Sequence, residues 1–395
     1  MDRSLRIWVI CVGLIVAIGP LSIDMYLPSF PALQVYFSTD AASVQSTLSF
    51  FFIGLAIGQL IYGPIADRYG RRTPLLFGLL LYVLAAIGCS FAPNIEALAG
   101  LRFLQALGGS AGMVVTRAMV RDRFEPQEMA KILSATVAVM GIAPIIAPTL
   151  GGLIFRSFGW QAIFYVLAGF GVLCLLTAAR ALPETLTQRA SGGVHNVARS
   201  YLELLRHRHF MAYALAGGLG SSMMFSYISV SAFVFIDVYH FTPVQFSWLF
   251  GCNAAALIVA AQLNARVLRT VSAPVVLRRA LTTSAVASVL MLMMALTGIG
   301  GAPAIIAPLF VAIGSLGFSS PNAVATAMAP FPARAGIAAA LIGTVQFTLA
   351  AISGSIAGHL QGDSAIAMAA VMAACGVLAV VLLRMLSRDA AARIS

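Results

Sequence analysis

The chain has 395 residues, of which 60% are hydrophobic and only 9% are charged. Soluble domains carry about 25% charged residues, so a water-soluble globule is excluded because too little polar surface is present to cover it. The formal net charge of +11 would suit a nucleic-acid partner, but the placement of the arginines described below excludes that class. Lipid is therefore the solvent expected for most of the chain.

Apolar runs recur along the chain between clusters of charged and turn-forming residues. Six of them cover 6–28, 43–65, 74–93, 97–119, 132–155 and 160–182, and six more cover 209–236, 245–268, 275–298, 302–328, 335–360 and 365–386. Each is long enough to cross a bilayer as a helix. The longest polar stretch, 183–208, separates them. We therefore predict an all-α polytopic membrane protein with twelve transmembrane helices: a six-helix bundle at 1–182, a cytoplasmic linker at 183–208, and a second six-helix bundle with a short tail at 209–395.

Positive charge marks every loop that follows an even-numbered run. These loops, the linker and the tail hold most of the arginines, among them Arg68, Arg71, Arg72, Arg121, Arg123, Arg199, Arg206, Arg266, Arg269, Arg278, Arg279, Arg334 and Arg384. Retained positive charge is typical of cytoplasmic loops. The pattern predicts that both termini and the linker lie in the cytoplasm.

The most specific local pattern follows the second run. It consists of Gly63, Asp67, Arg68, Gly70, Arg71 and Arg72. Gly70 permits a tight turn, and Asp67 lies where it can pair with Arg71 or with the positive end of a neighbouring helix. An ordinary charged loop is the alternative interpretation. The order of residues resembles the G-x-x-x-D-R-x-G-R-R/K loop of the major facilitator superfamily, which implies a fold of two six-helix halves and a gate at the cytoplasmic side.

An arginine, Arg102, lies inside the fourth run. Inserting an arginine costs about 2.5–3.5 kcal/mol, so its side chain should face protein or water. At helical spacing Gln105 shares its face. The alternative is a side chain that reaches outward to the membrane surface. The segment resembles the span-four motif of proton-coupled antiporters, and this resemblance implies a role for Arg102 in proton coupling.

Asp24 is the only acid within an apolar run of the N-terminal half. Ionisable residues inside membranes mark proton relays and ion pathways, which makes Asp24 a candidate proton carrier. A solvated aspartate near a helix end is the alternative. The D-x-Y-L-P-x-x-P string that begins at Asp24 is similar to that of the bicyclomycin and chloramphenicol resistance (Bcr/CflA) branch of drug/proton antiporters.

The fifth run contains two prolines, Pro144 and Pro148, followed by Gly151 and Gly152. Prolines four residues apart predict a kink, and paired glycines predict close packing against a neighbouring helix. A kink that serves packing alone is the alternative. The motif resembles the one that marks exporters, although Ala147 stands where that motif commonly has Gly-Pro.

Polar and aromatic residues within the runs are candidates to line a substrate cavity, although packing is the commoner role for each alone. They are Tyr26, Gln59, Gln105, Tyr165, Phe225, Tyr227, Asn253 and Gln346. The five cysteines are isolated, no residues have metal-ligand spacing, and no phosphate-binding G-x-x-x-x-G-K-[ST] loop occurs. We therefore expect no metal or cofactor, with the proton gradient as the energy source.

The resemblance implies proton-coupled efflux of a drug or another small amphipathic molecule across the bacterial inner membrane, by a monomer without a nucleic-acid partner. A major facilitator importer or exporter of a specific metabolite is the alternative. A membrane channel or an embedded enzyme is a further alternative, but no clustered histidines, cysteines or paired carboxylates supply catalysis, and a channel gives no reason for the Asp67 loop.

Overall fold

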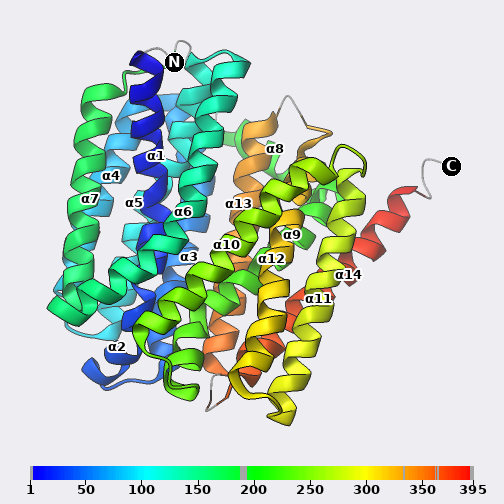
Figure 1. The fold of residues 1–395 in the computed structure, drawn as a ribbon. Helices are drawn as coiled ribbons and strands as arrows, with labels where there is room; N and C mark the ends of the chain where they lie inside the picture. Colours follow the sequence, from blue (N-terminus) through cyan, green and yellow to red (C-terminus); the bar gives the residue numbers. More distant parts are fainter. Residues whose placement is uncertain (1–2, 187–193, 332–333, 361, 363, 392–395) are drawn as a thin grey trace.

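The computed structural model describes residues 3–186, 194–331, 334–360, 362 and 364–391. Long helices form two groups side by side (Figure 1). The N-terminal group contains α1 (Arg3–Asp24), α3 (Ala41–Tyr69), α4 (Arg72–Ser90), α5 (Ile95–Arg123), α6 (Pro126–Phe158) and α7 (Trp160–Ala181). The C-terminal group contains α9 (Arg208–Ala232), α10 (Pro243–Val267), α11 (Ala273–Thr297), α12 (Gly301–Met328), α13 (Ala335–His359) and α14 (Ile366–Ala391).

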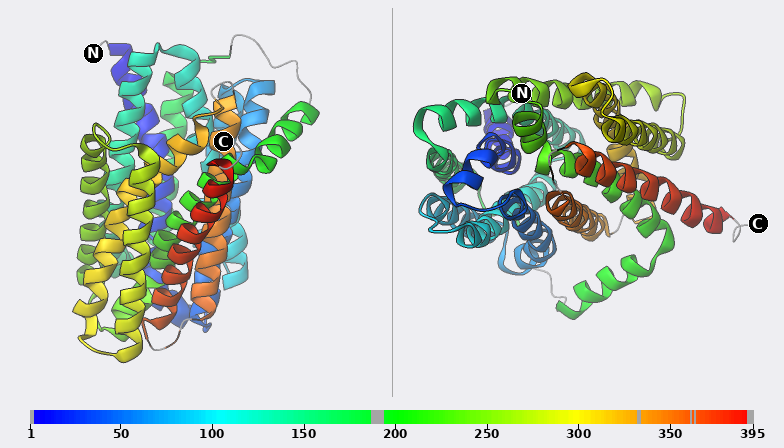
Figure 2. Two further views of the ribbon diagram at one scale, coloured as in Figure 1. Left: turned by 90° about the vertical axis from the view of Figure 1, so that its right-hand side faces the viewer. Right: turned by 90° about the horizontal axis from the view of Figure 1, so that it is seen from below.

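Short helices complete the chain. They are η1 (Leu27–Ser29) and α2 (Phe30–Tyr36) after α1, α8 (Val194–Arg206) in the linker, and η2 (Phe233–Val238) after α9. Figures 1 and 2 show the N terminus, the linker and the C-terminal end of α14 toward one end of the molecule, called the basic end below. The opposite end is called the far end.

The predicted all-helical membrane fold is confirmed. Among the described residues, eleven helices are long and apolar enough to cross a membrane. The run predicted at 132–155 lies in α6. Within α6, the described segment Ile142–Phe158 is apolar but shorter than the other eleven. Helices α3 and α5 continue beyond their predicted ends to Tyr69 and Arg123, because charged residues there extend each helix past the apolar layer.

The linker is more structured than a polar stretch predicts. Helix α8 lies outside the two groups, at the basic end (Figure 2). Its Leu204 is buried in an apolar cluster with Phe210 and Leu341 of the C-terminal group. Glu203 accepts hydrogen bonds from Arg199 at 3.1 Å and from Arg334 at 2.5 Å. Helix α8 therefore packs against the C-terminal group, which a composition-based view of 183–208 could not show.

Helices α3 and α13 form the main contact between the groups. Gln45 of α3 is fully buried against two glycines of α13. A Cβ atom on Gly354 would lie 2.9 Å from Gln45 Nε2, and one on Gly358 would lie 2.8 Å from Gln45 Oε1. Nearer the basic end, Gln59 fits against Gly343 in the same way. Glycine therefore sets how closely the two groups approach each other.

Glycines also bring helices together within each group. A Cβ atom on Gly54 of α3 would overlap the carbonyl oxygen of Phe103 in α5, and one on Gly317 of α12 would overlap that of Leu257 in α10. These two helix pairs, α3 with α5 and α10 with α12, hold corresponding places in the two groups. The internal symmetry is thus one of helix packing, although the two halves share little sequence.

We expect Gly54→Ala to lower the melting temperature of the purified protein, because the new methyl group forces α3 and α5 apart. Overpacking of this kind costs about 1–3 kcal/mol. Gly100→Ala in α5 is the matched control, since nothing lies within 4 Å of a Cβ atom there. Thermal melts in detergent compare the two, and equal melting temperatures would contradict the packing role of Gly54.

Candidate functional site

Helix α1 ends at Asp24, within the first predicted run, and not in a loop. The last carbonyl groups of a helix have no partner within that helix, so they need donors from elsewhere. The guanidinium of Arg102 in α5 supplies one, because its Nη2 donates a hydrogen bond to the carbonyl oxygen of Ser22 at 2.8 Å. A cation at the C-terminal end of a helix also interacts favourably with the helix dipole.

Arg102 is completely buried and faces the protein interior. Its Nη1 donates to Gln105 Oε1 at 2.6 Å, so the two residues that share a helix face also share a hydrogen bond. The guanidinium carbon lies 4.1 Å from the ring centre of Phe51 and 4.8 Å from that of Tyr26. Aromatic faces stabilise a cation by about 2 kcal/mol where water is excluded. Among the described residues, Arg102 has no carboxylate partner.

Asp24 is 3% exposed but does not pair with Arg102. In the described part of the chain its carboxyl group has no ion pair or hydrogen bond. It interacts electrostatically with Tyr227 of α9, in the other group of helices. The hydroxyl of Tyr227 is 3.5 Å from Asn253 Nδ2, and its ring stacks on Phe250 at 5.4 Å. Asp24 therefore lies at the boundary between the two groups.

The proline and glycine motif brings α6 to the same place. A Cβ atom on Gly151 would overlap the carbonyl of Met25, the residue after Asp24. Pro144 and Pro148 lie inside the helix, and the carbonyl of Pro148 accepts a hydrogen bond from Ser247 Oγ of α10 at 3.2 Å. Gly152 also faces Ser247. The motif thus packs α6 against both the end of α1 and the C-terminal group.

Several cavity candidates gather where the groups meet. Tyr26 is buried and hydrogen bonds to Thr47 at 3.1 Å. The ring of Phe225 lies 4.7 Å from that of Phe52 in α3. Phe225 thus joins Tyr227, Asn253 and Gln59, already described, at one boundary, whereas the Tyr26 side chain contacts Thr47, Arg102 and Phe164 within the N-terminal group.

Two other candidates lie elsewhere, and a third is already occupied. Tyr165 is 49% exposed and meets Phe91 edge-on, on the outside of the N-terminal group. Gln346 lines a small hollow within the C-terminal group beside Tyr213. Gln105 is engaged by Arg102. No group of three metal-ligating side chains occurs among the residues that the structure describes.

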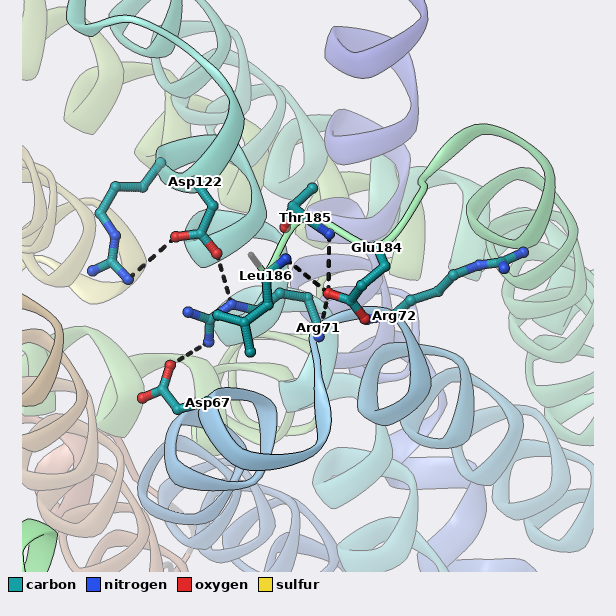
Figure 3. Close-up of polar contacts among 8 residues, drawn as sticks. Asp67, Arg71, Arg72, Asp122, Glu184, Thr185 and Leu186 are labelled. Carbon is teal, nitrogen blue, oxygen red and sulfur yellow. Dashed lines mark hydrogen bonds and ion pairs between the residues drawn. The ribbon is translucent and has the colours of Figure 1, made fainter. Parts of the chain in front are cut away.

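A charge cluster occupies the basic end, around the loop between α3 and α4 (Figure 3). Arg71 is 3% exposed and binds two carboxylates: its Nη1 donates to Asp67 Oδ1 at 2.5 Å and its Nε to Asp122 Oδ2 at 2.8 Å. Asp122 comes from the end of α5. Spacing predicted the Asp67–Arg71 pair, whereas Asp122 lies 51 residues away in sequence.

Glu184 of the linker caps the same turn (Figure 3). Its Oε1 accepts hydrogen bonds from the backbone N–H of Arg71 at 2.8 Å, Thr185 at 2.9 Å and Leu186 at 2.9 Å, and its Oε2 from that of Arg72 at 3.1 Å. Partial burial alone would raise the pKa of Glu184, but these donors outweigh it and lower the pKa. Sequence reasoning missed this cap, which joins residues more than a hundred positions apart.

Gly70 is required at this turn for two reasons. Its φ of +95° is a conformation that side-chain-bearing residues rarely adopt. A Cβ atom there would also lie 2.5 Å from Glu184 Oε2. The other motif residues are less enclosed, since Gly63 faces open space and Arg68 lies over the ring of Tyr69 at 5.5 Å.

The charge cluster also reaches the linker helix and the C-terminal group. Arg121 Nη2 lies 3.6 Å from Asp122 Oδ1, and a Cβ atom on Gly336, at the start of α13, would lie 3.4 Å from Arg121 Nη1. The hydroxyl of Tyr201 in α8 donates to the carbonyl of Leu60 at 3.4 Å. Burial raises the pKa of Tyr201 to about 12, and the negative charge of Asp67 acts in the same direction.

We expect Glu184→Gln to lower the melting temperature at neutral pH, because an amide nitrogen would replace one of the two accepting oxygens. Because the pKa of Glu184 is lower in the folded protein, its carboxylate stabilises the fold fully at pH values above the ordinary pKa of 4.5. This stabilisation is lost as the pH falls from 4.5 through the lowered pKa. The difference from the wild type should therefore shrink in acid. Thermal melts across this pH range test it, with the exposed Glu96→Gln in α5 as control; a difference that persists unchanged in acid would contradict the cap.

Comparison with known proteins adds family relationships to this geometry. The sequence profile of the Major Facilitator Superfamily matches residues 12–355. An uncharacterized MFS-type transporter of Bacillus subtilis, YdgK, is 36% identical, with 93% of this chain and 92% of the relative covered. A bicyclomycin resistance protein homolog of Haemophilus influenzae is 32% identical, with 96% of each covered. A chloramphenicol resistance protein of Pseudomonas aeruginosa is 34% identical over 66% of this chain and 62% of its own.

Solved structures share the fold at much lower identity. A D-xylose-proton symporter matches with a TM-score of 0.75 at 14% identity, covering 96% of this chain and 97% of its own. A peptide transporter crystallised with sulfate matches with a TM-score of 0.78 at 13% identity, covering 97% and 94%. Sequence profile, relatives and fold agree that this chain is a multi-pass transporter of the major facilitator superfamily, related to its bicyclomycin and chloramphenicol resistance proteins.

Proposed function

We propose that the protein is a proton-coupled exporter of drugs or other small amphipathic molecules in the bacterial inner membrane. The relatives named for bicyclomycin and chloramphenicol resistance support the class of cargo. The observation that carries the proposal is Asp24, a buried carboxyl group without a cationic partner among the described residues, at the boundary between the two groups of helices. In the proposed cycle, 1–182 and 209–395 rock as two bodies about this boundary.

Asp24 is the proton carrier in this scheme. An unpaired charge in a closed, apolar site is costly, and protonation removes that charge. When the boundary opens to water on one side, the carboxylate can be solvated and the proton leaves. Tyr227, which interacts electrostatically with Asp24, is on α9 of the opposite group and lies 3.5 Å from Asn253 of α10. This links proton release to the position of the two groups.

Arg102 positions the end of α1. A guanidinium does not lose its proton under physiological conditions, so Arg102 itself is not the carrier. Its hydrogen bond to Ser22 ties α5 to the segment that holds Asp24, and its hydrogen bond to Gln105 fixes the guanidinium within α5. The substrate would contact the boundary residues Gln59, Phe225, Tyr227 and Asn253, and Tyr26 beside Arg102, in a pocket that forms when the groups separate.

The charge cluster of Asp67, Arg71 and Asp122 acts as a latch on the cytoplasmic side. The arginine-rich loops support a cytoplasmic basic end, with both termini and the linker there. The latch reaches the start of α13 through Arg121, which pairs with Asp122, and Tyr201 of α8 interacts electrostatically with Asp67 and donates to the carbonyl of Leu60 in α3. Separation of the groups at this end breaks these contacts first.

Expression in a bacterial strain that lacks its own drug pumps tests the function. We expect higher inhibitory concentrations for several unrelated drugs, and we expect Asp24→Asn to abolish the increase because no proton can be released from an amide. Asp40→Asn is the control, since Asp40 caps α3 in a far-end loop and asparagine caps equally well. Undiminished resistance with Asp24→Asn would refute the proton role, and a flat drug panel would favour a metabolite carrier.

Arg102→Lys and Arg102→Ala separate positioning from charge. We expect Arg102→Ala to eliminate proton-driven uptake into inverted vesicles and to destabilise the protein, because Ser22 and Gln105 lose a donor at about 1–3 kcal/mol each. Arg102→Lys keeps the charge but cannot bond both acceptors in the same fork geometry, so transport should be reduced but measurable. Equal transport by the two variants would show that the charge is irrelevant.

A further inference from the structure

A cavity of about 810 Å³ lies outside the boundary between the groups, on the outer side of the C-terminal group. Helix α11 lines most of it, with Ala307, Pro308 and Val311 of α12 and Arg384 of α14. Figure 2 shows the C-terminal part of α14 extending away from the bundle. The cavity shares no residue with the candidate transport site and is within the roughly 300–1,000 Å³ range of ligand sites.

The cavity is basic at one end and apolar along the rest. Arg278, Arg279 and Arg384 line it near the basic end of the molecule, where α11 begins and α14 approaches its end. Val286 and Leu290 follow Arg278 down the same face of α11, at steps of four residues. The lining thus combines a cationic head with an apolar groove.

The length of the cavity fits one leaflet of a bilayer. Twelve residues separate Arg278 from Leu290, which is about 18 Å along a helix. Half of a typical hydrocarbon core is about 15 Å. The groove residues face outward, with Val286 64% and Leu290 45% exposed, so the occupant comes from the lipid side.

Among the described residues, no protein group neutralises the three arginines. None of the lining residues is acidic. Within the described ranges, Arg278, Arg279 and Arg384 form no ion pair, whereas Arg71 and Arg334, at the same end, bind carboxylates. Three like charges around one opening repel each other unless an anion lies between them. Charge complementarity therefore calls for an anionic occupant with an apolar tail.

We propose that this cavity binds an anionic phospholipid of the cytoplasmic leaflet, with its phosphate among Arg278, Arg279 and Arg384 and an acyl chain along Val286, Leu290 and Val311. Basic pockets between membrane helices on the cytoplasmic side are suited to such headgroups. The lipid joins α11 to α14, because the arginines that hold its phosphate come from both helices. It stabilises the C-terminal group from outside, independently of which substrate the protein carries.

Purified full-length protein in mild detergent tests the site through its melting temperature. Titration with phosphatidylglycerol should raise the melting temperature to a plateau, whereas phosphatidylcholine, inorganic phosphate and glycerol phosphate should not. The double variant Arg278→Gln/Arg279→Gln should bind the lipid more weakly, which raises the half-saturating concentration about 30-fold. Arg266→Gln/Arg269→Gln is the matched control, because these arginines are exposed at the same end but do not line the cavity.

Val286→Trp tests the groove without changing any charge, because the indole ring would fill the space of the acyl chain. It should also abolish the phosphatidylglycerol effect while the variant melts near the wild type without lipid. If Arg266→Gln/Arg269→Gln weakens phosphatidylglycerol binding as much as Arg278→Gln/Arg279→Gln does, the effect is general charge attraction and the proposed site is wrong. A rise with inorganic phosphate alone, or an equal rise with phosphatidylcholine, would overturn the lipid assignment.

Discussion

The end of α1 inside the protein is the constraint on which the rest of the N-terminal group depends. In lipid, carbonyl groups released at a helix end must find donors within the protein. Arg102 of α5 donates to Ser22, and Gly151 of α6 leaves room for the chain at Met25. Three helices therefore meet at one point because one of them stops there. Asp24 is the last residue of that helix, and it lies close enough to Tyr227 of the C-terminal group for the two to interact electrostatically.

Two buried arginines illustrate different ways of stabilising a charge in this protein. Arg71 is neutralised by two carboxylates, and one of them, Asp67, is 48% exposed. Water can replace such contacts at low cost when the basic end opens, which suits a latch. Arg102 is held by a carbonyl, an amide oxygen and aromatic rings, without any carboxylate among the described residues. Moving it would leave buried acceptors without a donor, so Arg102 suits a fixed support in the proposed transport cycle.

Contacts within a helix could be predicted from the sequence, and contacts between distant segments could not. Spacing predicted that Asp67 reaches Arg71 and that Gln105 reaches Arg102, because side chains three and four residues apart are neighbours. The contact of Glu184 with Arg71 and Arg72 gave no such signal, since these two residues lie more than a hundred positions earlier. Tyr165 shows another limit: in a helix that is apolar all round, sequence does not tell the lipid-facing side from the buried one. Its neighbour Phe164 is fully buried, whereas Tyr165 is half-exposed.

Two sets of arginines at the basic end look alike in the sequence but have different partners. Arg71 binds Asp122 and thereby joins the α3–α4 loop to α5, and Arg334 binds Glu203 and thereby joins α8 to the start of α13, whereas Arg199 pairs with Glu203 within α8. Arg278, Arg279 and Arg384 face the membrane side, where the anion must come from the bilayer. The net charge of +11 therefore does more than orient the chain. One set forms ion pairs within the protein, and the other is placed to bind an anionic lipid in the proposed cavity.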